Sequence, residues 1–272
     1  MRDFTRKLII MTDIHIMKPG RKIIGLDPSE RFQACLAHAA ENHADADALI
    51  LMGDLVHHGI AEQYAQFKGL LNGLPWPVHM TIGNHDIRET FQAAFPDAPK
   101  DENGFVQHSI QVGDHTLLIL DTNDPSTEPY HGGNLCEDRL SWLSAQLAGK
   151  SRGSVVIAMH HPPFTTGFPG MDDIGLQNRE AFNRIVAESP AVAMVMAGHV
   201  HRTIWGIAGG KPCAVLKSPC HQMPMELDEA NSSLSIDEPG AYGVLLLGND
   251  DPVLLTADVG LEGHINEDED SR

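Results

Sequence analysis

The segment Val78-His79-Met80-Thr81-Ile82-Gly83-Asn84-His85-Asp86 decides how this chain folds. Its first five residues form a mostly apolar run typical of a buried strand, and a turn that carries an amide, an imidazole and a carboxylate follows directly. Four other apolar runs end in the same way in potential metal ligands: residues 7–12 before Asp13 and His15, residues 48–52 before Asp54, residues 154–159 before His160, and residues 192–197 before His199 and His201. Ligands bind at the carboxyl ends of strands in open α/β architectures, so these five strand ends predict one shared site. We interpret that site as dinuclear.

Helices are expected between the first strands. Asp27-Pro28-Ser29-Glu30 predicts a helix start, with Asp27 as the N-cap and Glu30 three residues beyond it as in a capping box. Three helices are expected in this half: residues 28–43, 61–71 and 87–95. The alternation of strands with helices predicts βαβ units and a largely parallel sheet.

The second half of the chain adds antiparallel hairpins to this pattern. Leu140, Leu143 and Leu147 have helical spacing, and Gly149 is placed to end that helix. The other expected elements are a hairpin over residues 105–111 and 115–121, a Gly- and Pro-rich loop over 164–175 that is well placed to wall a pocket, a helix over 178–188, a hairpin over 203–207 and 213–217, an irregular segment over 218–240, and strands over 242–247 and 252–257. We expect one domain over residues 1–262, followed by a disordered acidic tail over 263–272.

Composition narrows the function classes. The 272 residues carry 19 Lys and Arg against 37 Asp and Glu, a net charge of −18. Such a surface repels polyphosphate, which disfavours binding of long nucleic acids. The four cysteines include no C-x-x-C pair and suit a reducing cytosol, and no run reaches 18 apolar residues. We therefore expect a cytoplasmic protein that does not enter a membrane.

Each motif by itself is also typical of an ordinary surface turn. In extended backbone Asp13 and His15 leave the same face of the chain, as ligands must. Gly83 lets the backbone turn sharply, Asn84 offers a neutral carbonyl oxygen to a metal, and His85 would lie beside the metals. Because all the motifs follow strand ends, a metal site explains the set better than independent turns do.

The blocks D-x-H, G-D, G-N-H-D, H and G-H-x-H occur here in that order, and the set resembles the calcineurin-like metallophosphoesterase superfamily over residues 7–222. The resemblance implies an α/β (α+β) fold in which two mixed β-sheets pack as a sandwich flanked by helices, in four layers. It also implies two metal sites: Asp13, His15, Asp54 and His201 at the first, and Asp54, Asn84, His160 and His199 at the second. Asp54 would bridge the two metals, and His161 would either contact a metal ligand without binding a metal itself or be structural.

The residues within and near these blocks suggest a subfamily. Protein Ser/Thr phosphatases carry Asp-Arg-Gly shortly after the G-D block, whereas this chain has Val56-His57-His58-Gly59. Three other blocks resemble the class III cyclic nucleotide phosphodiesterases and related glycerophosphodiesterases: Gly53-Asp54-Leu55-Val56, Met159-His160-His161-Pro162-Pro163 and Cys220-His221-Gln222. In that subfamily a histidine matching His221 lies near the substrate. The remaining histidines have no ligand context and are interpreted as structural or solvated: His38, His43, His79, His108, His115, His131 and His264.

The resemblance implies a phosphodiesterase that hydrolyses cyclic nucleotides or other small phosphodiesters. Two divalent or trivalent ions of manganese, iron or zinc, about 3.5–4 Å apart, would hold a bridging hydroxide that attacks phosphorus. His85 would act as general acid or as a hydrogen-bond donor to the phosphate, with Asp86 orienting its ring. The alternatives are a phosphomonoesterase, a glycerophosphodiesterase or a nuclease, and outside the enzymes a non-catalytic scaffold. Relatives also suggest a homodimer or a larger homo-oligomer.

Overall fold

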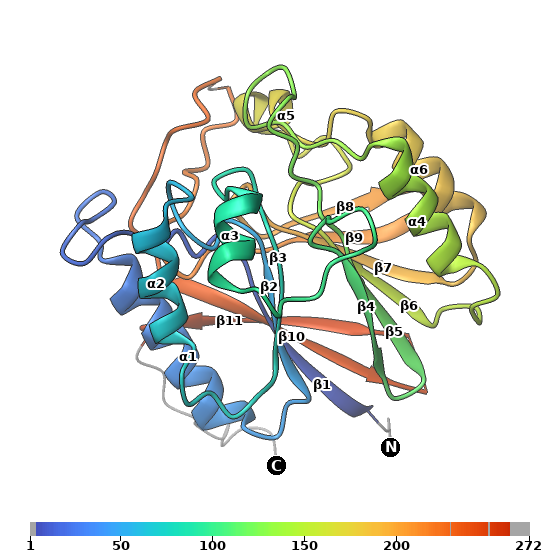
Figure 1. The fold of residues 1–272 in the computed structure, drawn as a ribbon, viewed down its shortest axis with the longest axis horizontal. Helices are drawn as coiled ribbons and strands as arrows, with labels where there is room; N and C mark the ends of the chain where they lie inside the picture. The colour runs from blue at the N-terminus through green and yellow to red at the C-terminus, as the bar shows by residue number, and fades with distance from the viewer. Residues whose placement is uncertain (1–3, 229, 250, 262–272) are drawn as a thin grey trace, which may run out of the picture.

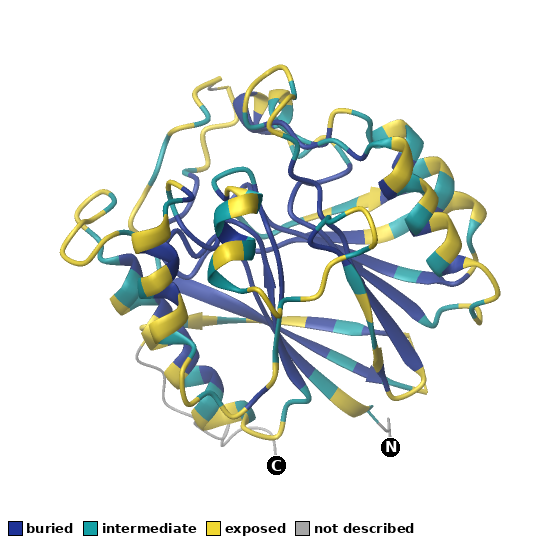
Figure 2. Cartoon of the chain, viewed as in Figure 1, coloured by how far each residue is buried: buried dark blue, intermediate teal, exposed yellow. Residues whose placement is uncertain are grey.

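Two mixed β-sheets lie face to face and carry helices on their outer sides (Figure 1). The computed structural model describes residues 4–228, 230–249 and 251–261. Figure 2 shows central strands that are buried along most of their length, edge strands that are partly exposed, and helices whose outer faces are exposed. No helix in these described ranges is both long and apolar enough to cross a membrane.

The first sheet has the order β11-β10-β1-β2-β3. Its strands are β1 (Phe4–Met11), β2 (Ala48–Met52), β3 (Val78–Thr81), β10 (Gly240–Gly248) and β11 (Val253–Val259). β1, β2 and β3 are parallel, whereas β10 runs antiparallel to β1 and β11 antiparallel to β10. The helices that pack on its outer face are α1 (Pro28–His43), α2 (Ala61–Leu70) and α3 (Arg88–Ala94).

The second sheet has the order β4-β5-β6-β7-β9-β8. Its strands are β4 (His108–Val112), β5 (His115–Ile119), β6 (Val155–Ala158), β7 (Val192–Ala197), β8 (Ile204–Ala208) and β9 (Lys211–Val215). β5, β6, β7 and β9 are parallel, and antiparallel hairpins close both ends. Helices α4 (Glu137–Leu147) and α6 (Arg179–Glu188) cover its outer face.

Strand β1 shows why four layers form. Ile9 and Met11 pack outward with Phe32 of α1, while Leu8 and Ile10 on the opposite face pack against the second sheet. Side chains alternate along a strand, so a strand that is apolar at every position is buried on both faces. The predicted fold class is confirmed.

The predicted elements agree with the structure to within about three residues at most ends. Both β2 and β7 match their predicted bounds, and β4 starts at His108 rather than at residue 105. The predicted tail over residues 263–272 lies outside the described residues, so its disorder stays a prediction.

The segment over residues 164–175, predicted as a Gly- and Pro-rich loop, contains the short helix α5 (Pro169–Asp173), which the sequence did not predict. Phe168 and Met171 are buried in the core beneath it. A side chain at Gly170 would overlap the backbone of Ala230. Tertiary packing therefore shapes this turn, which local sequence does not reveal.

Removal of the α1 cap tests the predicted helix start. The Asp27 carboxylate accepts hydrogen bonds from the backbone nitrogens of Ser29 (2.9 Å) and Glu30 (3.4 Å). The substitution Asp27→Ala is expected to lower the free energy of unfolding, measured by urea denaturation, by about 1 kcal/mol. Asp27→Asn keeps an acceptor oxygen and should lose less than half as much. Equal losses in both variants would contradict the capping role.

Candidate metal centre

The loops that follow β1, β2, β3, β6 and β7 meet at one end of the two sheets. Backbone hydrogen bonds join the first two loops, from Asp13 N to the oxygen of Gly53 (3.0 Å) and from His15 N to the oxygen of Asp54 (2.8 Å). The backbone nitrogen of His199 donates to both carboxylate oxygens of Asp13, each at 3.0 Å. Side chains from strands far apart in the chain are thereby fixed next to one another.

Backbone strain is concentrated in these loops. Seven described residues other than glycine have a φ in the left-handed region. Five of the seven are predicted metal ligands: Asp13, His15, Asp54, His199 and His201. Non-glycine residues in this region cost of order 1–3 kcal/mol each and cluster at functional sites, where the surrounding structure enforces them.

The first predicted ligand set forms a compact buried cluster. One ligand atom from each of Asp13, His15, Asp54 and His201 lies within 4.8 Å of all the others. Nε2 of His15 is 3.0 Å from Nε2 of His201, which is 3.4 Å from Oδ1 of Asp13. Nδ1 of His201 lies 3.0 Å from the backbone oxygen of His221 and can only donate to it, which leaves the lone pair of Nε2 facing the cluster.

The second predicted set converges on the side chain of Asn84. Its Oδ1 lies 3.0 Å from Nε2 of His160 and 2.9 Å from Nδ1 of His199. Nδ1 of His160 donates to the backbone oxygen of Met52 (3.0 Å), so its Nε2 also turns a lone pair inward. Oδ2 of Asp54 lies 3.4 Å from His160 Nε2 in this set and 3.5 Å from His15 Nε2 in the first. One carboxylate oxygen therefore stands between the two sets.

The electrostatics of the cluster fit bound cations. Burial by itself would raise the pKa of Asp54, but the imidazoles of His160, His85 and His15 outweigh burial and hold this pKa well below its usual range. Burial would also lower the pKa of His160, yet the carboxylates of Asp54 and Asp13 raise it to about 9. The fold thus buries an anionic carboxylate next to a protonated imidazole, and a cation bound among these ligands would replace the charge of that proton and use the Nε2 lone pair that its loss frees. Nitrogen and oxygen donors of this kind fit manganese, iron or zinc.

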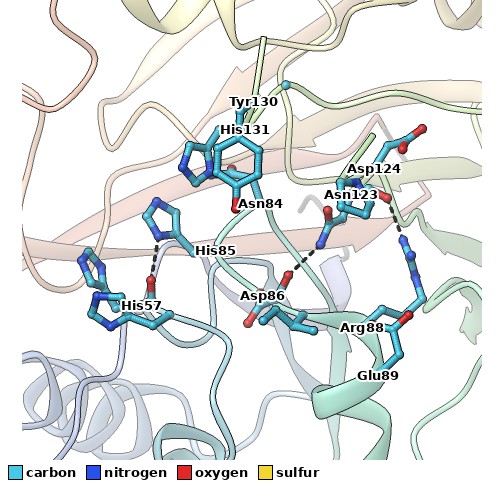
Figure 3. A pocket seen from close by; sticks show the side chains of 14 residues that line it. His57, Asn84, His85, Asp86, Arg88, Glu89, Asn123, Asp124, Tyr130 and His131 are labelled. Carbon is cyan, nitrogen blue, oxygen red and sulfur yellow. Dashed lines mark hydrogen bonds between the residues drawn. The ribbon is translucent and has the colours of Figure 1, made fainter. Parts of the chain in front are cut away.

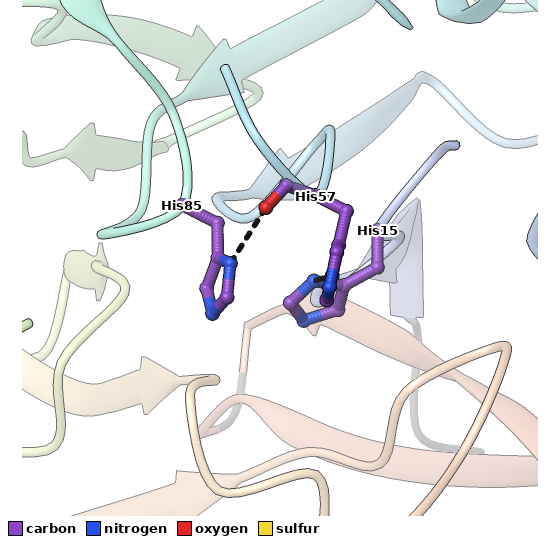
Figure 4. Close-up of side chains that lie close together, drawn as sticks. All are labelled: His15, His57 and His85. Carbon is purple, nitrogen blue, oxygen red and sulfur yellow. Dashed lines mark hydrogen bonds between the residues drawn. The ribbon is translucent and has the colours of Figure 1, made fainter. Parts of the chain in front are cut away.

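His85 lies at the mouth of the cluster. Its backbone nitrogen donates to Oδ1 of Asp54 (2.9 Å), and its Nδ1 lies 2.8 Å from the backbone oxygen of His57 (Figures 3 and 4). A carbonyl oxygen can only accept, so Nδ1 carries the proton and Nε2 is the ring nitrogen left for a ligand.

The expectation that Asp86 orients the ring of His85 is wrong. Asp86 is 4% exposed, and its carboxylate accepts hydrogen bonds from four donors of the protein. They are the backbone nitrogens of Leu55 (3.1 Å), Val56 (3.3 Å) and Gly83 (2.9 Å) and the hydroxyl of Tyr64 (2.8 Å). Burial, with the charge of Asp54 nearby, raises the pKa of Asp86 to about 6. Asp86 thus ties the loops after β2 and β3 together, and the His57 carbonyl orients the His85 ring instead.

His221 lies against the first ligand set. Its ring centre is 4.6 Å from that of His201 and 5.3 Å from that of His15. Its Nδ1 is buried and has no hydrogen-bond partner among the described residues. The ring lines a cavity of about 390 Å³ together with Asp54 and Asn84, which is where a residue near the substrate is expected.

Two histidines that the sequence left without a function also lie at the site. The ring of His57 stacks on one side of His85 (centres 5.0 Å apart, planes at 23°), and the ring of His131 stacks on the other side (5.0 Å, 20°). Nδ1 of His57 is 3.1 Å from Nδ1 of His15, and Nδ1 of His131 is 3.0 Å from Nδ2 of Asn84. The departure from Asp-Arg-Gly at residues 56–59 is a signal that could have found His57. No sequence pattern marks His131, which lies in an irregular loop.

Two cavities open on either side of this stack. The first, of about 480 Å³, is bordered by polar groups and by Tyr130 (Figure 3). The second, of about 390 Å³, is lined by apolar residues and by five of the seven predicted ligands, His15, Asp54, Asn84, His199 and His201. The apolar residues that line the second are Ile23, Ile24, Met171, Ile174, Met223 and Leu234. The cavities share His57, Asn84, His85 and His131 as a common wall.

Known proteins with similar sequences are named phosphoesterases or phosphodiesterases. The family model described as calcineurin-like phosphoesterase matches residues 6–203. A probable cyclic nucleotide phosphodiesterase of Rhodopseudomonas palustris is 37% identical over 238 residues, which cover 87% of this chain and 86% of that protein. A probable glycerophosphodiester phosphodiesterase of Arcobacter nitrofigilis is 28% identical and covers 85% of each chain.

A solved structure has the same fold. The crystal structure of a dimetal phosphatase from Danio rerio superposes with a TM-score of 0.70, covering 94% of this chain and 99% of that one. The two sequences are 13% identical, so this likeness concerns the architecture alone.

A methyl group at Gly83 tests whether the crowded centre holds metals. A Cβ at Gly83 would overlap Oδ1 of Asp54 and lie 2.7 Å from Nε2 of His160. Gly83→Ala is expected to displace both ligands and to weaken metal binding about 10- to 100-fold, measured as metal content after equilibrium dialysis. Gly69→Ala in α2 has open space around the added Cβ and should keep the wild-type metal content. An unchanged metal content in Gly83→Ala would contradict this placement of the ligands.

Proposed function

Because the chain belongs to the calcineurin-like phosphoesterase family, we propose that it is a metal-dependent hydrolase of phosphoric diesters with cyclic nucleotides as its substrate class. The observation that carries the proposal is the position of Asp54 Oδ2, which lies within 3.5 Å of an imidazole nitrogen in each of the two ligand sets. A shared carboxylate of this kind suits a pair of cations.

Each cation would have its own ligands besides the shared Asp54. Asp13, His15 and His201 would hold the first, and Asn84, His160 and His199 would hold the second. We propose manganese, iron or zinc at these positions, because the donors are nitrogen and oxygen. The chemistry that such a pair supplies, when bound, is polarisation of a phosphoryl oxygen and activation of water at neutral pH.

His85 would donate a proton or a hydrogen bond during departure of the leaving group. Its Nδ1 proton is committed to the His57 carbonyl, so in the doubly protonated imidazolium the Nε2 proton is the one that can be donated to a phosphoryl oxygen or to the departing alkoxide. The stacked rings of His57 and His131 restrict the plane in which His85 can reach the substrate. The chain's own contribution is therefore to orient one imidazole beside the ligand cluster.

The charges around the site favour diesters over monoesters. Arg88 is the only lysine or arginine among the described residues that line the two cavities. Its guanidinium is held by both carboxylate oxygens of Asp121 (2.9 and 3.1 Å) and by the backbone oxygen of Asn123 (2.6 Å). No free guanidinium is left in these linings to clamp a dianionic monoester, and a diester carries a single charge.

The second cavity suits a nucleotide. Its apolar lining residues can cover the face of a base while polar groups hold the phosphate, and its size falls in the range of ligand pockets. The similarity to a probable glycerophosphodiester phosphodiesterase makes glycerophosphodiesters the second candidate class.

We place the enzyme in the cytoplasm, since all four cysteines are free.

A substrate panel tests the proposed function. The metal-loaded protein is expected to hydrolyse 3′,5′- or 2′,3′-cyclic nucleotides with a kcat/KM at least about tenfold above that for an aryl phosphomonoester, because the site offers no free cation to a dianion. Glycerophosphodiesters in the same panel decide between the two candidate classes. Each substrate is assayed with manganese, iron and zinc. Faster hydrolysis of the monoester than of every diester would overturn the proposal.

Replacement of His85 tests its place in the reaction. His85→Ala is expected to keep the wild-type metal content and to lower kcat about 10²- to 10⁴-fold, since it removes a proton donor and no predicted ligand. The matched control is His38→Ala on α1, whose Nδ1 contacts the hydroxyl of Tyr242 away from the cavities. It should keep the wild-type rate. An unchanged kcat in His85→Ala would exclude the assigned role.

A further inference from the structure

His131 stands where the two cavities meet. It belongs to the segment between β5 and α4, and it lines the first cavity (Figure 3) as well as the second. Its φ is +76°, in the left-handed region that it shares with five predicted metal ligands. A non-glycine residue in this region is held there by its surroundings, and such residues gather at functional sites. His131 belongs to none of the sequence motifs, so its function has to be inferred from its contacts.

One contact decides which end of the Asn84 amide faces the ligand cluster. Nδ1 of His131 lies 3.0 Å from Nδ2 of Asn84. An amide nitrogen can only donate, so the ring nitrogen must accept from it. Oδ1 of Asn84 then faces His160 Nε2 (3.0 Å) and His199 Nδ1 (2.9 Å). With the amide turned over, its NH₂ group would face these nitrogens, and it has no lone pair to offer a cation.

Two further contacts hold His131 in this orientation. Its ring lies nearly parallel to that of His85, with centres 5.0 Å apart. Its backbone oxygen lies 3.2 Å from Nε2 of His161, a fully buried ring whose Nδ1 is 2.7 Å from the hydroxyl of Thr122. Main chain and ring are thus fixed independently of each other, and Nδ1 is directed at Asn84.

We propose that His131 is a positioning residue: it accepts a hydrogen bond from the Asn84 amide and thereby keeps Oδ1 of Asn84 directed at the second ligand set. The inference rests on the proposed function, because that function assigns a metal ion to the second ligand set. Groups that hydrogen-bond to metal ligands fix their orientation, and their loss commonly weakens metal binding about 10- to 100-fold.

Two substitutions separate the hydrogen bond from the backbone conformation. His131→Gly removes the acceptor while tolerating the positive φ. His131→Asn restores an acceptor, because its Oδ1 is as many bonds from the main chain as Nδ1 of histidine, and asparagine also tolerates positive φ. Both variants keep the backbone oxygen that contacts His161. Circular dichroism and thermal unfolding of each variant confirm that it is folded.

The measurement is the binding of Mn²⁺ alone to each protein by equilibrium dialysis, with no substrate present. His131→Gly is expected to lower the affinity for one of two Mn²⁺ ions about 10- to 100-fold and to leave the affinity for the other within about threefold of wild type. His131→Asn should recover most of that loss. A wild-type isotherm for His131→Gly, or equal weakening in both variants, would overturn the inference alone. A wild-type protein that bound none of manganese, iron and zinc in the same dialysis would overturn the proposed function as well.

Discussion

A carboxylate buried among imidazoles is the constraint on which the rest of the structure depends. Asp54 is 2% exposed and follows β2, whose five residues are all buried. A buried charge is costly unless it is paired, so the surrounding loops must bring positive charge or donors to it. The backbone of His85 donates to it, and His15 and His160 contact it from opposite ligand sets. The left-handed backbone of these loops is a cost that this arrangement imposes.

The sequence predicts the framework of the site because strand ends are easy to recognise. An apolar run followed by glycine and a polar group, as in Gly53-Asp54, marks the end of a buried strand. Parallel strands place their carboxyl ends at one edge, so the topology alone brings Asp13, Asp54 and Asn84 together. The cap at Asp27 and the end of α4 near Gly149 were predictable for the same reason, since each depends on a few neighbouring residues.

The features that the sequence did not predict depend on contacts between distant segments. Asp86 is adjacent in sequence to His85, yet its carboxylate turns inward to the loop after β2 and to Tyr64. His131 reaches the site from an irregular segment without periodicity, and its neighbours there come from two other loops. Helix α5 forms because Met171 packs into the core. The residues adjacent in sequence do not identify such distant partners, so these contacts could be found only from the structure.

The most direct test of this account is anomalous X-ray scattering from crystals of the protein grown with Mn²⁺. The account predicts two peaks, both within bonding distance of the Asp54 carboxylate. One peak should also contact Asp13, His15 and His201, and the other should contact Asn84, His160 and His199. A single peak, or two peaks of which neither touches Asp54, would contradict the claim that one buried carboxylate joins two cation sites.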